Sequence, residues 1–206
     1  VLSAYNGSFD HVLAFVLLAA VFDFLDGMMA RLLNAYSAIG KELDSLADMI
    51  SFGLLPGMIA FKLLQETPLP GWVAYFGFLL TIFSALRLAK FNIDTRQTNT
   101  FIGLPTPANA LFWSSLITGG GAWLNELNAG WVLLLGLIAL FSYFLVSEIP
   151  MFSLKFKNLS WRSNRIRYIF LLCCLPMLLL GFLAPVAIIS WYLLLSVGLY
   201  LKGERV

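Results

Sequence analysis

Charged residues are scarce in this chain: they make up 12% of its 206 residues, whereas 60% are hydrophobic. Soluble domains carry about a quarter of charged residues, so this composition excludes an ordinary soluble protein. A helix needs roughly 20 apolar residues to cross a bilayer core of about 30 Å. The length therefore accommodates about seven membrane spans with short connections and leaves no room for a soluble domain. We expect a single membrane domain over residues 1–206.

Cysteine and histidine are also rare. The two cysteines, Cys173 and Cys174, are adjacent in an apolar run, where neither a mutual disulfide bond nor a metal-ligand spacing is plausible. We interpret them as packing residues. The one histidine, His11, has no histidine or cysteine companion and stands at the edge of an apolar stretch, which favours an interfacial residue over a metal ligand.

Long hydrophobic runs, by contrast, fill the sequence. They extend over residues 10–33, 45–65, 71–90, 106–124, 130–147, 166–183 and 185–201. Polar or turn-forming residues separate them, most weakly between the last two. The pattern predicts an all-α fold, a polytopic transmembrane helical bundle of about seven spans.

The distribution of basic residues predicts how the bundle is oriented. If the spans alternate, 12 of the 13 lysines and arginines fall on one membrane face, and only Lys62 falls on the other. The 12 are Arg31, Lys41, Arg87, Lys90, Arg96, Lys155, Lys157, Arg162, Arg165, Arg167, Lys202 and Arg205. Because cytoplasmic loops carry such an excess, we expect the basic face to be cytoplasmic, in the cell's inner or plasma membrane. On this topology residue 1 lies outside, so we also expect a further span before it, lost by truncation.

Four of the 11 acidic residues lie close together: Asp23, Asp26, Asp44 and Asp48. At about 100° per residue, the first two share one face of a helix and the last two share one face of the next. The short connection between these helices makes them antiparallel neighbours. We therefore expect both acidic faces to meet at the cytoplasmic end.

Such a cluster needs a compensating cation. A charge within the membrane costs roughly 2.5 to 3.5 kcal/mol on insertion scales. Hard divalent ions prefer oxygen ligands, and two of them about 3.5 to 4 Å apart can clamp the attacking and leaving oxygens of a phosphoryl group. Gly27, Ala30 and Gly40 lack bulk on the same faces, which would let a flat base or a diphosphate approach the backbone, and Arg31 adds a cation. The pattern predicts a two-metal site for phosphoryl chemistry.

Two other readings of the aspartates remain open. They could cap helices and pair with Arg31 and Lys41 at a solvated edge, although Asp23 lies in an apolar run. They could also belong to a divalent-cation transporter, in which acidic residues line a pathway at mid-membrane. Clustering at one membrane face beside small residues argues against transport.

These residues form the pattern D-x2-D-G-x2-A-R-x8-G-x3-D-x3-D, with all eight fixed positions present. The pattern closely resembles the signature of the CDP-alcohol phosphotransferase family, also called CDP-alcohol phosphatidyltransferases. Three further segments resemble its phosphatidylserine synthase branch: residues 43–53 followed by Pro56, residues 85–92, and residues 101–107. The resemblance covers about residues 20–110.

The resemblance implies an enzyme that transfers a phosphatidyl group from CDP-diacylglycerol to L-serine, releasing phosphatidylserine and CMP. It implies that Asp23, Asp26, Asp44 and Asp48 hold two divalent ions, Mg²⁺ or Mn²⁺, and that Asp48 is also the general base. It further implies a homodimer among membrane lipids, with no nucleic-acid partner.

The same resemblance suggests the residues that bind the two substrates. CDP-lipid contacts are expected from Asp26, Gly27, Ala30, Arg31, Gly40 and Asp44. For the acceptor we expect Arg87, Lys90, Asn92 and Asn109, although Arg87 and Lys90 could equally be membrane anchors and Asn92 a helix-end turn. Phosphatidylglycerophosphate or phosphatidylinositol-phosphate synthesis is the rival activity within the family, because the acceptors of those reactions carry a phosphate and need extra cations.

Overall fold

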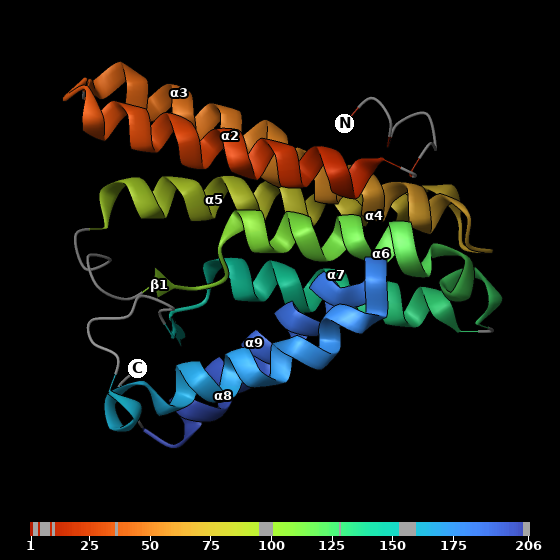
Figure 1. The fold of residues 1–206 in the computed structure, drawn as a ribbon. Coiled ribbons are helices and arrows are strands. Elements are labelled where there is room, and N and C mark those ends of the chain that lie inside the picture. Colours follow the sequence, from red (N-terminus) through yellow and green to blue (C-terminus); the bar gives the residue numbers. More distant parts are fainter. Residues whose placement is uncertain are drawn as a thin grey trace.

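A computed structural model describes residues 1, 4, 9, 11–35, 37–94, 101–127, 129–152 and 160–203 of the chain. Within these residues the fold is almost entirely helical (Figure 1). The α-helices are α2 (Val12–Leu32), α3 (Ala38–Asp48), α4 (Leu55–Gln65), α5 (Leu79–Ile93), α6 (Thr106–Glu126), α7 (Gly130–Val146), α8 (Trp161–Met177) and α9 (Ala184–Leu201). The short segments are the π-helix η1 (Met49–Leu54), the 3₁₀-helices η2 (Gly71–Phe78) and η3 (Leu178–Leu183), and two-residue strands β1 (Phe101–Ile102) and β2 (Pro150–Met151), which pair antiparallel.

All seven predicted apolar stretches are helical. Among the described residues, four helical segments are long and apolar enough to cross a membrane: Val12–Leu32, Ala38–Gln65, Gly71–Ile93 and Asn164–Leu201. Helix α7 is apolar but shorter, at 17 residues. Many large hydrophobic side chains point outward, including Phe24, which is 69% exposed. Outward apolar surface on this scale is stable in lipid and not in water, so the chain is a helical membrane protein. The count of seven spans stays a prediction.

The last two predicted stretches form one hairpin. Between α8 and α9, Gly181 has φ +57° and ψ −120°, in a region that glycine enters without a steric penalty. The chain reverses there, and α9 returns alongside α8 (Figure 1). The weak break predicted at this point is therefore a real turn. Cys173 and Cys174 in α8 are both free thiols, as the interpretation as packing residues requires.

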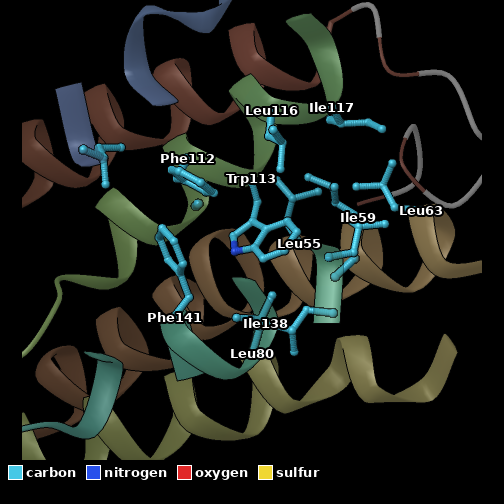
Figure 2. Close-up of a cluster of buried hydrophobic side chains, with 14 of the residues drawn as sticks. Leu55, Ile59, Leu63, Leu80, Phe112, Trp113, Leu116, Ile117, Ile138 and Phe141 are labelled. Carbon is cyan, nitrogen blue, oxygen red and sulfur yellow. The ribbon is translucent and has the colours of Figure 1, made fainter. Parts of the chain in front are cut away.

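Helix α6 lies at the centre of the bundle, in contact with α2, α4, α7 and α9. Its Trp113 is fully buried among side chains of α4, α5 and α7 (Figure 2). The ring of Phe112 lies 4.1 Å from that of Phe141 on α7, measured between centroids. This interlocked apolar layer fixes the positions of α4, α5, α6 and α7 relative to one another, and the α2–α3 pair contacts it through α6 and η1.

Helix α3 continues through η1 into α4 without a break in the chain's direction. The π-helix widens the turn directly after Asp48, a local geometry that is frequent at functional sites. The hydroxyl of Thr81 on α5 donates to the carbonyl oxygen of Gly53 within η1, at 3.2 Å. A side chain of α5 thus supplies a hydrogen bond to the irregular turn, which ties α3 to the core.

Helix α4 and η2 approach each other closely at a glycine. A Cβ atom on Gly77 would lie 2.9 Å from the backbone carbon of Ala60 and from the carbonyl oxygen of Gly57, and would also meet the backbone nitrogen of Phe61. We predict that Gly77→Ala lowers the free energy of unfolding by about 1 to 3 kcal/mol, because backbone atoms must move. Thermal unfolding in detergent measures the effect.

The matched control is Gly136→Ala on α7, where no atom lies within 4 Å of the added Cβ. Alanine is the better helix former by about 1 kcal/mol, so this variant should be as stable as the parent or more stable. Equal melting temperatures for Gly77→Ala and Gly136→Ala would contradict the close packing described here.

Candidate functional site

A cleft of about 1220 Å³ lies along α2, α3 and the turn that joins them. Seven of the eight signature residues line it: Asp23, Asp26, Gly27, Ala30, Arg31, Gly40 and Asp44. Apolar side chains such as Phe24, Met28 and Leu43 line it as well. The cleft thus combines carboxylates, a cation and an apolar wall, which are features that an amphiphilic ligand requires.

The antiparallel pairing that places these residues depends on the backbone at Asn34 and Ser37, between α2 and α3. Asn34 adopts φ +51°, a left-handed conformation that asparagine tolerates better than most residues. Ser37 caps α3, because its side-chain oxygen accepts a hydrogen bond from the backbone nitrogen of Gly40 at 3.0 Å. A Cβ atom on Gly40 would lie 2.8 Å from that oxygen, so the glycine makes room for the cap.

The aspartates of the two helices meet at one point. Carboxylate oxygens of Asp23, Asp26 and Asp44 all lie within 4.8 Å of one another. Asp48, one turn beyond Asp44, lies within hydrogen-bonding reach of Asp23 and interacts electrostatically with all three. Ligand distances of about 2.0 to 2.6 Å around Mg²⁺ or Ca²⁺ place oxygens up to about 5 Å apart on opposite sides of an ion. The donor set and its spacing therefore fit a hard divalent cation.

Gly27 lies beside this cluster, and its position is open. No atom lies within 4 Å of where its Cβ would be, so packing within the described part of the protein does not require a glycine. A side chain there would instead project into the cleft, which Gly27 lines. The small residue therefore enlarges the space next to the carboxylates.

Arg87 of α5 approaches the cluster from the protein interior. Its guanidinium interacts electrostatically with Asp48, its Nε donates to the carbonyl oxygen of Leu104 at 2.6 Å, and its Cζ lies 5.6 Å from the centre of the Phe91 ring. The side chain is buried, only 7% exposed. A buried cation beside a carboxylate cluster contributes to charge balance and can orient an anionic group.

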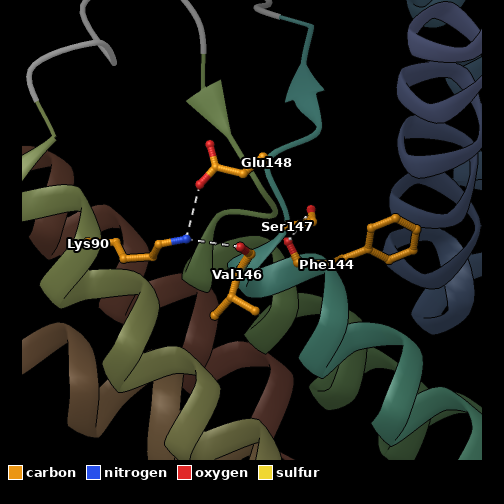
Figure 3. Close-up of polar contacts among 5 residues, drawn as sticks. All are labelled: Lys90, Phe144, Val146, Ser147 and Glu148. Atoms are coloured by element: carbon orange, nitrogen blue, oxygen red, sulfur yellow. Dashed lines mark hydrogen bonds and ion pairs between the residues drawn. The ribbon is translucent and has the colours of Figure 1, made fainter.

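The other three predicted acceptor residues have different surroundings. Lys90 forms an ion pair with Glu148 at 3.1 Å and donates to the carbonyl oxygen of Val146 at 3.3 Å, so it caps the end of α7 (Figure 3). Asn92 donates to the hydroxyl of Ser45 on α3 at 2.9 Å. Asn109 is fully buried in α6, and within the described part of the chain neither polar atom of its side-chain amide has a hydrogen-bond partner.

Lys90 therefore links α5 to the end of α7, and Asn92 links α5 to α3, so both residues hold together the helices around the site. The ammonium of Lys41 on α3 donates to the backbone oxygen of Asn92 at 3.0 Å, a second link between α3 and α5. The segment before α6 is fixed in turn, because the backbone nitrogen of Leu104 donates to the carbonyl of Phe144 at 2.8 Å. Sequence reasoning did not anticipate Ser45, although it stands within the 43–53 segment.

A family model described as CDP-alcohol phosphatidyltransferase matches residues 1–143. This chain belongs to that family. The resemblance seen in the signature is confirmed, and the match extends beyond the aspartate pair through α6 to most of α7. Helices α8 and α9 lie outside the matched residues.

Curated relatives named CDP-diacylglycerol–serine O-phosphatidyltransferase are similar to the chain. The Helicobacter pylori J99 protein is 34% identical, and the match covers 96% of this chain and 80% of the relative. The Bacillus subtilis protein is 44% identical, and the match covers 45% of this chain and 52% of the relative. The Mycobacterium leprae protein is 36% identical, and the match covers 68% of this chain and 48% of the relative. The chain thus spans about half the length of the B. subtilis and M. leprae proteins.

The carboxylate cluster predicts metal binding that can be measured directly. Asp44→Asn removes a charged ligand from the three-residue group, so it should weaken Mn²⁺ binding to the purified protein by about 10-fold or more. Calorimetry or electron paramagnetic resonance of the bound ion gives the affinity. Glu42→Gln, an exposed change on the same helix outside the cluster, should leave it unchanged. Equal affinities in the two variants would refute the assignment of Asp44 as a ligand.

Proposed function

We propose that this protein is an integral membrane enzyme, a CDP-diacylglycerol–serine O-phosphatidyltransferase. It transfers a phosphatidyl group from CDP-diacylglycerol to L-serine and yields phosphatidylserine and CMP. The observation that carries the proposal is the meeting of the carboxylates of Asp23, Asp26 and Asp44 within 4.8 Å, in a cleft lined by the rest of the signature. The activity for which the H. pylori J99 relative is named supports it, since the match to that protein covers 96% of this chain.

The cleft suits the two halves of a CDP-lipid. Its apolar side chains face the region where acyl chains must stay, while Gly27 and Ala30 leave room beside the carboxylates for the nucleotide. Arg31 and Lys41 at the cleft wall provide cations for phosphate oxygens. A substrate with lipid tails and a water-soluble head can therefore bind with each part in its preferred solvent.

Asp23, Asp26, Asp44 and Asp48 would hold two divalent ions, Mg²⁺ or Mn²⁺. When bound, these ions would neutralise the diphosphate and align the attacking and leaving oxygens. Asp48 would have a second task as general base, because it interacts electrostatically with both the carboxylate cluster and Arg87. It accepts the proton of the serine hydroxyl as that oxygen forms a bond to the lipid-side phosphorus, and the phosphorus–oxygen bond to CMP breaks.

Arg87 is the cation that we assign to the serine carboxylate. It is buried, it faces Asp48, and its Nε contact with Leu104 holds the guanidinium in place. A guanidinium fixed in this way binds a carboxylate at little further cost in side-chain entropy. A phosphorylated acceptor would require further cations there, and Lys90 is already engaged with Glu148.

We further propose the orientation and the assembly. All seven apolar segments would cross the membrane as one domain over residues 1–206, since α6 and α7 run side by side with the longer helices (Figure 1). The helix ends that carry most described basic residues, which are the end of α2, the start of α3, the end of α5 and the start of α8, lie at one end of the bundle, and the 66–70 connection after α4 lies at the other. The basic end would face the cytoplasm. The family resemblance supports a homodimer.

Asp48→Asn should reduce kcat by about 10² to 10⁴-fold, because the amide cannot accept the serine proton. If the base role outweighs the metal role, binding of the CDP-lipid stays nearly unchanged. CMP release from CDP-diacylglycerol gives the rate, and equilibrium binding of the lipid to the variant gives the affinity. Glu42→Gln serves as the control, with full activity expected. A parallel loss of lipid affinity in Asp48→Asn would show that Asp48 is chiefly a ligand.

The acceptor is tested by offering serine, glycerol 3-phosphate and inositol phosphate separately with CDP-diacylglycerol and Mg²⁺ or Mn²⁺. Serine should support the fastest CMP release. Arg87→Ala should then raise the KM for serine about 10-fold or more and change the KM for CDP-lipid little, because acceptor binding is what it removes. Arg165→Ala, an exposed change on α8, is the control. Faster turnover with glycerol 3-phosphate than with serine would be consistent with the family but would overturn serine as the acceptor.

A further inference from the structure

A polar layer lies inside the bundle next to its apolar core. Ser84, Asn109 and Ser142 each stand four residues, about one helical turn, from a member of the buried cluster in Figure 2. Those members are, in the same order, Leu80 on α5, Trp113 on α6 and Ile138 on α7.

The three polar residues are displaced toward the same end of the bundle. Arg87 near the end of α5 contacts Leu104 just before α6, and Lys90 contacts Val146, the last residue of α7. The end of α5, the start of α6 and the end of α7 therefore lie together, as Figure 1 also shows. Helix α6 runs antiparallel to α5 and α7. Moving four residues toward the C-terminus on α5 and α7 therefore leads in the same direction as moving four residues toward the N-terminus on α6. The three side chains consequently occupy one level.

This level is buried and its polar atoms are unpaired. Ser84 and Asn109 are 0% exposed and Ser142 is 4% exposed. Among the described residues there is no hydrogen-bond partner for the hydroxyls of Ser84 and Ser142, for either polar atom of the Asn109 amide, or for the indole nitrogen of Trp113. Figure 2 shows that nitrogen on the side of the ring toward Phe141 and Ile138. Each unpaired buried group costs about 1 to 3 kcal/mol, so four such atoms at one level, with the indole nitrogen of Trp113 from the adjacent turn of α6, indicate something that binds there.

The layer adjoins the proposed active site. Ser84 precedes Arg87 by three residues on α5, and Arg87 interacts with Asp48. The turn η1 begins directly after Asp48, and a Cβ atom on its Gly53 would lie 3.1 Å from the Cβ of Ser84. The backbone of η1 therefore packs directly against Ser84. Asp48 and Ser84 are thus neighbours through η1 on one side and through Arg87 on the other.

We propose that this layer binds the charged end of a small zwitterionic amino acid, the acceptor in the reaction proposed above, on which this inference rests. The hydroxyls of Ser84 and Ser142 and the amide oxygen of Asn109 accept hydrogen bonds from the ammonium group of the bound amino acid. The amide nitrogen of Asn109 and the indole nitrogen of Trp113 donate to the carboxylate together with Arg87. The layer's own groups are neutral and offer both donors and acceptors, which matches a zwitterion better than a phosphate dianion.

The decisive variant is Asn109→Leu, which replaces the unpaired amide by an apolar side chain of similar size. It should raise the KM for serine about 10-fold or more and leave the KM for CDP-diacylglycerol within about twofold. Its melting temperature should equal or exceed that of the parent, since removing an unsatisfied buried group is neutral or stabilising. Millimolar serine without CDP-lipid should raise the melting temperature of the parent and not of the variant.

Ser114→Ala is the matched control. Ser114 is fully buried on the same helix, but its hydroxyl donates to the carbonyl oxygen of Ala110 at 2.6 Å. The alanine variant should keep the parent KM for serine and the serine-induced rise in melting temperature. A loss of serine affinity in this variant as well would mean that any disturbance of α6 has the same effect, and would overturn the assignment.

The paired variant Ser84→Ala/Ser142→Ala decides the matter if Asn109→Leu does not fold, with the same rise in the KM for serine expected. If these variants release CMP with serine and their KM for serine equals that of the parent, the layer holds only water. The inference would then fail, while the proposed function would stand. Turnover with glycerol 3-phosphate and not with serine would overturn both.

Discussion

Mutual repulsion among carboxylates on α2 and α3 is the constraint on which this structure depends. Asp23, Asp26 and Asp44 approach within 4.8 Å of one another in a helix pair whose outer face is apolar. Such an arrangement is costly without a cation, because a membrane does not screen charge as water does. The cost explains why the cleft, the neighbouring cations and the proposed chemistry all occur at one place.

The helix pair is linked to the rest of the bundle by several side-chain contacts. Lys41 and Ser45 of α3 contact Asn92 at the end of α5, and Lys90 of α5 contacts Val146 at the end of α7. None of these exposed contacts contributes much stability individually. Together they connect the carboxylate cluster to the rigid apolar core, and a two-metal site requires ligands held to within fractions of an ångström.

The interior combines a tightly packed layer with a layer that leaves polar atoms unpaired. Trp113 takes part in both, since its ring packs among apolar side chains while its nitrogen has no partner. An apolar replacement at Asn109 or Ser84 would satisfy packing at lower cost. Sites that break local rules of stability in this way are commonly those that bind or react, which is why the polar layer is assigned to the acceptor.

The sequence by itself determined the helical membrane fold and the aspartate faces, because apolar run length and helical period are local properties. It also determined the family, through the spacing from Asp23 to Asp48. Only the tertiary structure separated Arg87, which faces Asp48, from Lys90, which caps α7, although both stood in one basic segment. It alone brought the helix segments that carry Ser84, Asn109 and Ser142 to the same end of the bundle, since that arrangement depends on the register between helices far apart in the chain. Helix register is set by packing against Trp113 and its neighbours, and no local pattern encodes it.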